Sequence, residues 1–265
     1  MTAPETRRHP LFDGWPPLAR RTGPDGPSLG LFLLSGSSMV AELCGTLPLD
    51  FTVLDLEASP MSKGDLLPML QALTGSSCAP LVRVPYLHRH HIEHALDLGA
   101  AGVMVPKVDT VEEARAAADA CRYPPFGTRG VNPARASGWF HDLPGYLADA
   151  AKRTTCLVQI ESPEAVAAAD AIAAVPGVDG LFVGTGDLAC SLGQPGVVSG
   201  PAMDRARAAV LAAARRHGRL AGIFAGGPEQ ARQYAAEGFD LIAVGNELAL
   251  LRETLRHALD GLRGA

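Results

Sequence analysis

The hydrophobic pattern of the chain is a repeat of short apolar runs, each of four or five residues, separated by longer stretches with helical spacing of apolar positions. Apolar runs of this length between amphipathic segments predict buried parallel strands joined by helices. The eight runs are residues 31–34, 51–54, 81–84, 102–105, 156–160, 180–183, 220–224 and 241–244. Eight strand–helix alternations over 265 residues favour an α/β fold, a closed (β/α)8 TIM barrel, over an open sheet.

Helices are predicted between these strands, and glycines follow several of them at C-cap positions. The clearest helical stretches are residues 61–73, 88–98, 111–121, 163–175, 203–217 and 228–237. The glycines are Gly99, Gly177, Gly218 and Gly238. Because no low-complexity linker divides the chain, we expect one TIM-barrel domain over residues 29–265. Residues 1–28 are rich in Pro, Arg and Gly and predict an N-terminal arm that is loose or joins a neighbouring subunit.

One long segment, residues 123–146, interrupts the strand–helix rhythm between the fourth and fifth strands. Long ordered loops at the carboxyl face of a barrel commonly serve as lids or subunit contacts, which is the position expected for this segment. Two interpretations of its polar residues remain open. Arg129, Arg135 and His141 could meet an anionic substrate, or the arginines could be solvated on a surface loop.

Composition and charge exclude several classes of protein. The formal net charge of -5 gives no electrostatic reason to expect nucleic acid or an anionic membrane as a partner. The five cysteines are scattered, odd in number and without a CxxC pair, so neither a disulfide framework nor a thiolate zinc site is indicated, and a reducing cytoplasm is expected. The N-terminal residues lack the apolar core of a signal peptide, and no apolar run is long enough to span a bilayer.

Two carboxylates follow neighbouring predicted strands. Glu161 ends the run at residues 156–160, and Asp187 follows Gly184-Thr185-Gly186 in a glycine-rich loop after the run at residues 180–183. Because neighbouring parallel strands end side by side, these carboxylates would meet at one edge, as at a hard-cation site. The alternative is that Glu161 caps the next helix and Asp187 is solvated in a loop.

Other strand ends supply further candidate chemistry. The second strand ends at Asp55 and Glu57, and the third supplies Arg83. Glycines after the seventh and eighth strands leave backbone N–H groups accessible to an anion. An arginine among carboxylates and a cation would suit an α-keto acid, because arginine pairs bidentately with a carboxylate or enolate while a metal takes the keto oxygen.

Five motifs together make the chain similar to a known enzyme family. They are LVQIES at residues 157–162, GLFVGTGDLACSLG at 180–193, LVRVP at 81–85, GAAGVMVPKV at 99–108 and RYPPFGTRG at 122–130. With these motifs the chain resembles the HpcH/HpaI aldolase/citrate lyase family of metal-dependent 2-oxo-acid aldolases, from about residue 29 to residue 251. The resemblance implies a carbon–carbon lyase that acts through a pyruvate-type enolate on a 2-oxo acid, with an aldehyde or a second oxo acid as its other substrate.

The resemblance also implies cofactor, site residues and assembly. Mg²⁺, Mn²⁺ or Co²⁺ would be held by Glu161 and Asp187, and Arg83 would stabilise the enolate. The implied substrate-binding residues are Arg83, Gln159, Gly184, Thr185 and Gly186, with backbone at Thr185 and Gly186 holding the substrate carboxylate. Barrels of this family assemble as trimers paired into hexamers, often exchanging the last helix, so a homo-oligomer is expected.

The chain departs from the family on its second strand. Members read Asp-x-Glu-His-(Ala/Gly)-Pro there, and the histidine is linked to acid–base work, whereas residues 55–60 read Asp-Leu-Glu-Ala-Ser-Pro and place Ala58 at the histidine position. Asp55, Glu57 and Asp97 match the family and, with Arg83, are the implied catalytic residues. In the family, Asp97 supports the histidine from an adjoining site.

Three consequences of the missing histidine remain open. Metal-bound water, the substrate or another histidine, of which His88 is nearest to Arg83 in the chain, could carry the proton. The reaction could instead be a condensation, as in relatives that form citrate or build ring systems. The chain could also be a 2-oxo-acid-binding protein with low turnover, because loss of acid–base help costs about 10²–10⁴-fold without abolishing binding.

Overall fold

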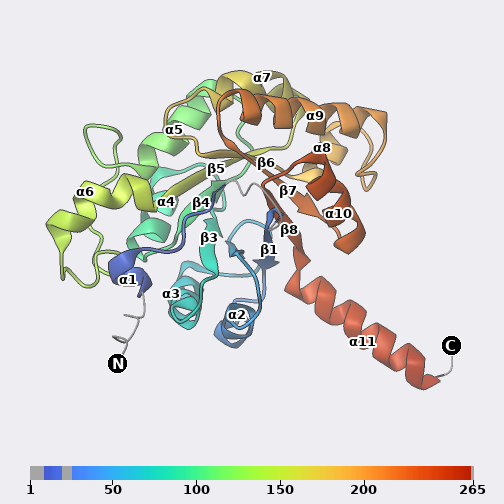
Figure 1. Ribbon diagram of the computed structural model, residues 1–265, viewed down its shortest axis with the longest axis horizontal. Coiled ribbons are helices and arrows are strands. Elements are labelled where there is room, and N and C mark those ends of the chain that lie inside the picture. Colours follow the sequence, from blue (N-terminus) through green and yellow to red (C-terminus); the bar gives the residue numbers. More distant parts are fainter. Residues whose placement is uncertain (1–8, 20–25, 264–265) are drawn as a thin grey trace, which may run out of the picture.

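The computed structural model describes residues 9–19 and 26–263, and its eight parallel strands close into a barrel in chain order (Figure 1). The strands are β1 (Ser28–Leu33), β2 (Phe51–Asp55), β3 (Ala79–Arg83), β4 (Gly102–Val105), β5 (Thr155–Ile160), β6 (Gly180–Val183), β7 (Leu220–Ala225) and β8 (Leu241–Asn246). The register is regular except for a shift between Gly30 and Phe32, where β1 pairs with β8. The predicted (β/α)8 barrel is confirmed.

Large side chains fill the barrel interior, and glycines on neighbouring strands leave the space that they occupy. Gly30 lies against Phe51, and a Cβ at Gly30 would stand 2.3 Å from the phenyl ring. Gly222 stands in the same relation to Phe182, at 2.4 Å. Strands buried on both faces explain why the runs are continuously apolar rather than alternating. A second apolar layer lies between the strands and the surrounding helices.

The six predicted helices are present, and five further helices belong to the described residues. The predicted ones are α3 (Lys63–Leu73), α4 (Arg89–Asp97), α5 (Val111–Cys121), α7 (Pro163–Ala173), α9 (Pro201–Arg216) and α10 (Pro228–Glu237). The others are α1 (Pro10–Asp13), α2 (Ser38–Gly45), α6 (Leu143–Arg153), α8 (Thr185–Ser191) and α11 (Glu247–Arg263). Capping boxes at Ser62 and Thr110 begin α3 and α5.

Helix α8 corrects the glycine-rich loop predicted after β6. Gly184 is its N-cap, and Leu188 and Ala189 are buried on its inner face. The buried pair anchors the helix directly after the strand. Asp187 therefore lies in the first turn of a helix rather than in an irregular loop.

The segment between α5 and β5 lies at the amino-terminal end of the barrel, so its predicted place at the carboxyl face is wrong. It follows the end of a helix and leads into the start of a strand. The interpretation of its arginines as solvated is wrong, because both are buried, and contact of either arginine with a substrate stays a prediction. Arg129 Nη2 donates to Asp97 Oδ1 at 2.7 Å, and Arg135 Nη2 donates to Thr74 Oγ1 at 3.1 Å. His141 packs against Phe12, with ring centroids 5.3 Å apart.

The described part of the N-terminal arm packs on this same end. Trp15 Nε1 donates to the carbonyl of Gly99 at 2.9 Å, and Arg153 Nη1 donates to the carbonyl of Phe12 at 2.9 Å. Residues 1–8 and 20–25 of the predicted arm lie outside the described residues. Strand β1 begins at Ser28, the last position of that arm.

Helix α11 projects away from the barrel (Figure 1). Within this helix Glu247 is buried, whereas the residues that follow it are exposed or partly exposed. Its exposed leucines are Leu248, Leu250, Leu251, Leu255, Leu259 and Leu262. Among the described residues, no helix combines the length and the apolar character needed to cross a membrane.

Candidate active site

A pocket of about 230 Å³ opens at the carboxyl ends of the strands. Its floor and one wall are apolar and come from Phe32, Leu34, Phe182 and Phe224. The remaining lining residues are Asp55, Ala58, Arg83, Gln159, Glu161, Gly184, Thr185, Gly186, Asp187 and Asn246. This is the face on which barrel enzymes carry their active sites. The pocket brings together most of the residues predicted for the site.

Arg83 is the cationic centre of the pocket. It is the last residue of β3 and pairs in register with Asp55, the last residue of β2. Its Nε and Nη2 donate to the two oxygens of Asp55 at 2.8 and 2.6 Å, and its guanidinium carbon lies 5.0 Å from the centre of the Phe32 ring. Burial alone would lower the pKa of Arg83, but the hydrogen bonds and charge of Asp55, together with the charges of Glu57 and Glu161, outweigh burial and raise this pKa.

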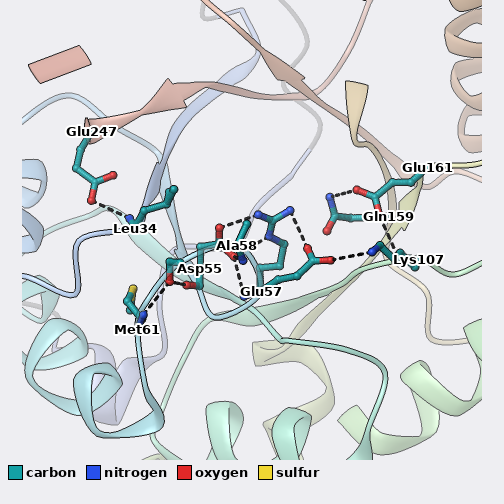
Figure 2. A network of polar contacts seen from close by, with 11 residues as sticks. Leu34, Asp55, Glu57, Ala58, Met61, Lys107, Gln159, Glu161 and Glu247 are labelled. Carbon is teal, nitrogen blue, oxygen red and sulfur yellow. Dashed lines mark hydrogen bonds and ion pairs between the residues drawn. The ribbon is translucent and has the colours of Figure 1, made fainter. Parts of the chain in front are cut away.

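Glu57 continues the ion-pair chain from Arg83 toward the pocket rim (Figure 2). Glu57 Oε2 lies 3.0 Å from Arg83 Nη1, and Glu57 Oε1 lies 3.8 Å from Lys107 Nζ. Burial raises the pKa of Glu57, and the charges of Arg83 and Lys107 offset that effect only in part. Two carboxylates thus share one arginine, which holds the guanidinium plane in a single orientation.

Glu161 follows β5 and is buried among polar partners. Gln159 Nε2 donates to Glu161 Oε1 at 2.9 Å, and the backbone N–H of Lys107 donates to Oε2 at 3.1 Å. A Cβ at Gly184 would stand 2.1 Å from Oε1, so only glycine leaves room for this carboxylate. Burial, followed by the negative charges of Asp187 and Glu57, raises the pKa of Glu161 to about 7.

The helix-capping alternative for Glu161 is wrong. Ser162 is the N-cap of α7, and its side chain accepts from the backbone N–H of Ala165 at 2.9 Å. Glu161 instead faces the pocket together with Asp187. Asp187 is solvent-exposed, as the alternative required, but it lies on a helix at the pocket edge.

The donor set suits a hard divalent cation. Among the described residues, Gln159 Oε1 is buried without a hydrogen-bond partner, and no cluster of three or more His, Cys, Asp or Glu side chains could hold a metal. A cation would therefore rest on Glu161 and Asp187, with other oxygens completing its shell. Mg²⁺ commonly binds through one or two carboxylates while keeping waters or substrate oxygens. A positive ion would also relieve the repulsion that raises the pKa of Glu161.

Ala58 presents a methyl group to the pocket at the position expected for the family histidine. Its backbone N–H donates to Asp55 Oδ1 at 3.3 Å, and Ser59 Oγ donates to the carbonyl of Asp55, so the turn is tightly held. His88 is exposed at the N-cap of α4 and packs against Tyr86, with centroids 6.0 Å apart. At the position where the resemblance predicts a proton carrier, the pocket wall is thus apolar.

Asp97 lies away from these residues, in the last turn of α4 at the other end of the barrel. It pairs with Arg129, and burial raises its pKa although Arg129 lowers it in part. Within one chain the structure therefore joins Asp55, Glu57 and Arg83 but leaves Asp97 apart. A contribution of Asp97 to a neighbouring copy stays a prediction.

Sequence reasoning assigned no role to the apolar lining, to Asn246 or to Lys107. Asn246 ends β8, and its Oδ1 accepts from the backbone N–H of Ala249 at 2.9 Å. The next residue, Glu247, accepts at 2.7 Å from the backbone N–H groups of both Leu34 and Ser35 through Oε1. The phenylalanines could have been found as inward-facing positions of the strands.

The pKa of Glu161 makes the stability of the metal-free protein depend on pH. A carboxyl whose pKa is raised from 4.5 to about 7 in the folded chain holds its proton more tightly than in the unfolded chain. Stability is therefore lost as pH rises from 4.5 to 7. We expect wild type to lose about 2 kcal/mol of unfolding free energy between roughly pH 5.5 and pH 8 through this group, and Glu161→Gln to remove that loss. Urea denaturation in a chelator measures it, and equal losses in both proteins would refute the assignment.

Comparison with known proteins agrees with this geometry. The family model for HpcH/HpaI aldolase/citrate lyase matches residues 28–254. A 5-keto-4-deoxy-D-glucarate aldolase from Klebsiella pneumoniae subsp. pneumoniae is 39% identical over 235 residues, covering 89% of this chain and 92% of the relative.

Two solved structures share the fold and are partly similar in sequence. An HpcH/HpaI aldolase/citrate lyase family protein from Burkholderia cenocepacia J2315 has a TM-score of 0.86 and 36% identity, covering 96% of this chain and 97% of that one. The citrate synthase SbnG has a TM-score of 0.82 and 25% identity, covering 90% and 94%. The chain therefore belongs to the HpcH/HpaI aldolase/citrate lyase family, and it is an enzyme of the carbon–carbon lyase class.

Proposed function

We propose that this enzyme breaks or forms a carbon–carbon bond of a 2-oxo acid through a pyruvate-type enolate, with Mg²⁺, Mn²⁺ or Co²⁺ as cofactor. The observation that carries the proposal is the position of Arg83, oriented by Asp55, in one pocket with Glu161 and Asp187. The pocket offers a fixed positive charge for an enolate beside a pair of carboxylates for a cation.

Each residue then has a defined task. The cation held by Glu161 and Asp187 would supply polarisation of the 2-oxo carbonyl. Arg83 stabilises the negative charge that develops on the enolate oxygen, and Asp55 keeps its guanidinium in plane. Backbone N–H groups at Thr185 and Gly186, at the start of α8, hold the substrate carboxylate. Phe32 and Phe182 exclude water from the reacting carbons.

Proton exchange tests this function without knowledge of the second substrate. Enolisation replaces the methyl protons of pyruvate by deuterium in D₂O, which proton NMR follows directly. We expect exchange in the presence of Mg²⁺ and none after chelation. Saturable pyruvate binding without exchange would instead support a binding protein with low turnover.

A second candidate function is a condensation in the synthetic direction, and Ala58 favours it. The metal and enolate residues are all present, while the pocket wall offers a methyl group where an aldolase would carry a proton. Condensation of the enolate onto a second oxo acid forms a carbon–carbon bond and leaves an alkoxide on the acceptor carbon, which would take its proton from the substrate or from water in place of a side chain. The similar protein SbnG is named as a citrate synthase. The space at Ala58 would then belong to that second substrate.

The variant Ala58→His separates the two candidates. If the chain is an ordinary aldolase that lost a proton carrier, the imidazole should raise cleavage of 4-hydroxy-2-oxo acids by up to about 10²–10⁴-fold. We expect a small gain, because the histidine would fill space that the second substrate occupies, and a loss of condensation with oxaloacetate. Steady-state kinetics with both substrate types decides, and Ala58→Leu controls for bulk. A large gain in cleavage without loss elsewhere would refute the condensation candidate.

We also propose that the enzyme acts in the cytoplasm as a homo-oligomer, a trimer or a hexamer. Support comes from α11, whose leucines are exposed in the single chain and would be buried against another copy. Nucleic acid and membranes are not proposed as partners, because the net charge is -5.

A further inference from the structure

The residues proposed to hold the enolate and the cation lie in one half of the barrel rim. Arg83 ends β3, Glu161 follows β5 and Asp187 follows β6, and the strands succeed one another in chain order around the barrel. The other half, from β7 through β8 and β1 to the turn after β2, lines the pocket with Phe32, Leu34, Asp55, Ala58, Phe224 and Asn246. Asp55 accepts from Arg83 through both oxygens. In this half, therefore, Asn246 supplies the polar side chain left for a substrate among the described lining residues.

The side-chain amide of Asn246 has a fixed orientation. Asn246 is the last residue of β8, and its Oδ1 accepts from the backbone N–H of Ala249 at 2.9 Å, in the manner of a residue that caps a helix. A flipped amide would turn Nδ2 toward that N–H and lose the hydrogen bond, so Oδ1 is assigned to the cap. The two N–H groups of Nδ2 have no acceptor within the described part of the chain. Since Asn246 lines the pocket, this amide offers it a neutral hydrogen-bond donor.

The backbone that carries this amide is held by the neighbouring strand. Phe32 of β1 lies opposite Asn246 in the register of β1 and β8. The next residue, Glu247, accepts at 2.7 Å from the backbone N–H groups of Leu34 and Ser35, and Figure 2 shows its carboxylate turned toward Leu34. The donor is thus fixed to the apolar wall and needs no rearrangement when negative charge forms beside it. Fixed donors of this kind are the effective ones at a developing oxyanion.

Carbon–carbon bond formation creates such a charge. The π electrons of the enolate form the new bond to the carbonyl carbon of the acceptor, and the enolate oxygen returns to a carbonyl. The π electrons of the acceptor carbonyl move onto its oxygen, which is an alkoxide until water or the substrate protonates it. Arg83 is committed to the enolate half, because its Nε and Nη2 donate to Asp55 and its Nη1 pairs with Glu57.

We infer that Asn246 donates a hydrogen bond from Nδ2 to the oxygen of the acceptor carbonyl and stabilises the alkoxide that forms there. The inference rests on the proposed function, in which the acceptor occupies the space beside Ala58, in the same half of the pocket as Asn246. Cleavage of a 4-hydroxy-2-oxo acid passes through the same alkoxide in reverse, so the donor serves both directions. An amide does not release its proton at neutral pH. Asn246 therefore stabilises charge and does not replace the missing proton carrier.

The variant Asn246→Asp removes the donor and keeps the cap, because a carboxylate oxygen accepts from Ala249 as the amide oxygen does. Two rates are measured with Mg²⁺. Pyruvate proton exchange in D₂O reports enolisation, and the carbon–carbon step is followed as product formation from pyruvate and oxaloacetate or as cleavage of 4-hydroxy-2-oxopentanoate. We expect the ratio of the carbon–carbon rate to the exchange rate to fall by about 10²-fold or more, the usual cost of losing one oxyanion donor. The fall should lie mainly in kcat, since the bound acceptor does not yet carry the charge.

Two further variants separate the donor from charge and from helix capping. Asn246→Ala adds no negative charge and should lower the same ratio, whereas a fall confined to Asn246→Asp would show repulsion by the new carboxylate and overturn the inference. Asn132→Asp changes the other asparagine of the chain, which is exposed in the segment before β5, and should keep the wild-type ratio. Circular dichroism melting compares the folded state of each variant with wild type.

The outcomes distinguish this inference from the function on which it rests. Absence of pyruvate proton exchange in wild type would overturn the proposed function itself. Exchange with a wild-type ratio in Asn246→Ala, or exchange in wild type without either carbon–carbon reaction, would overturn the role of Asn246 alone. Because exchange needs an intact cation and enolate site, a lower ratio at a measurable exchange rate cannot result from loss of fold.

Discussion

Glu161→Gln and Asp187→Asn are each expected to abolish tight Mn²⁺ binding while the barrel stays folded. Both carboxylates face one pocket, and among the described residues no third acidic, histidine or cysteine ligand could compensate for a loss. The decrease in affinity should exceed the roughly 10–100-fold that loss of an outer-shell partner costs. Isothermal titration of the metal-free protein with Mn²⁺ measures it.

The isosteric replacements keep this experiment specific. Gln at position 161 preserves the volume between Gln159 and Gly184, where a larger group has no space. Glu112→Gln, an exposed carboxylate on α5, serves as the control. Unchanged Mn²⁺ affinity in both site variants would show that the cation, if any, binds elsewhere.

Arg83→Lys is expected to slow pyruvate proton exchange by about 10²–10³-fold, the usual cost of one charge-stabilising donor. The guanidinium of Arg83 donates to both oxygens of Asp55, which hold it in place. The ammonium group of lysine cannot make this planar, two-point contact, so the positive charge would move away from the enolate. NMR exchange in D₂O with saturating Mg²⁺ provides the measurement. Arg89→Lys, an exposed cation of α4, should leave the rate unchanged.

Loss of fold must be separated from loss of chemistry in this variant. Asp55 is fully buried, and weakening its partner leaves a carboxylate partly uncompensated. Mn²⁺ affinity at Glu161 and Asp187 should persist if the pocket is intact. Exchange at the wild-type rate in Arg83→Lys would remove Arg83 from the mechanism.

The strand pattern predicted the barrel, because strands buried on both faces leave uninterrupted apolar runs. It also placed Asp55, Arg83, Glu161 and Asp187 correctly, since residues that end parallel strands must share one edge. Helix α8 was missed because Gly-Thr-Gly favours a loop, whereas the burial of Leu188 and Ala189 stabilises the helix. The helix is stabilised by tertiary packing, which the local sequence does not reveal.

The segment before β5 was also placed wrongly, because its position depends on contacts between residues that are distant in the sequence. Arg129 donates a hydrogen bond to Asp97 in the last turn of α4, and Arg135 donates one to Thr74 at the end of α3. These partners lie 32 and 61 residues away in the sequence, so no periodicity reveals them. The sequence placed Lys107 at the end of a strand but did not reveal its left-handed backbone or its backbone hydrogen bond to Glu161. Sequence patterns therefore predicted the residues of the candidate active site better than the conformation of the segments around the barrel.

Glu247 sets a boundary for protein engineering. Its carboxylate holds the backbone of Leu34 and Ser35, and Leu34 is part of the pocket wall, yet it is also the first residue of α11. The first turn of the helix thus supports the active site, whereas the remainder projects from the barrel and carries the leucines proposed to contact another copy. A cut before Glu247 removes a support of the pocket wall, whereas a cut beyond the first turn keeps that support and removes only the proposed contact between copies.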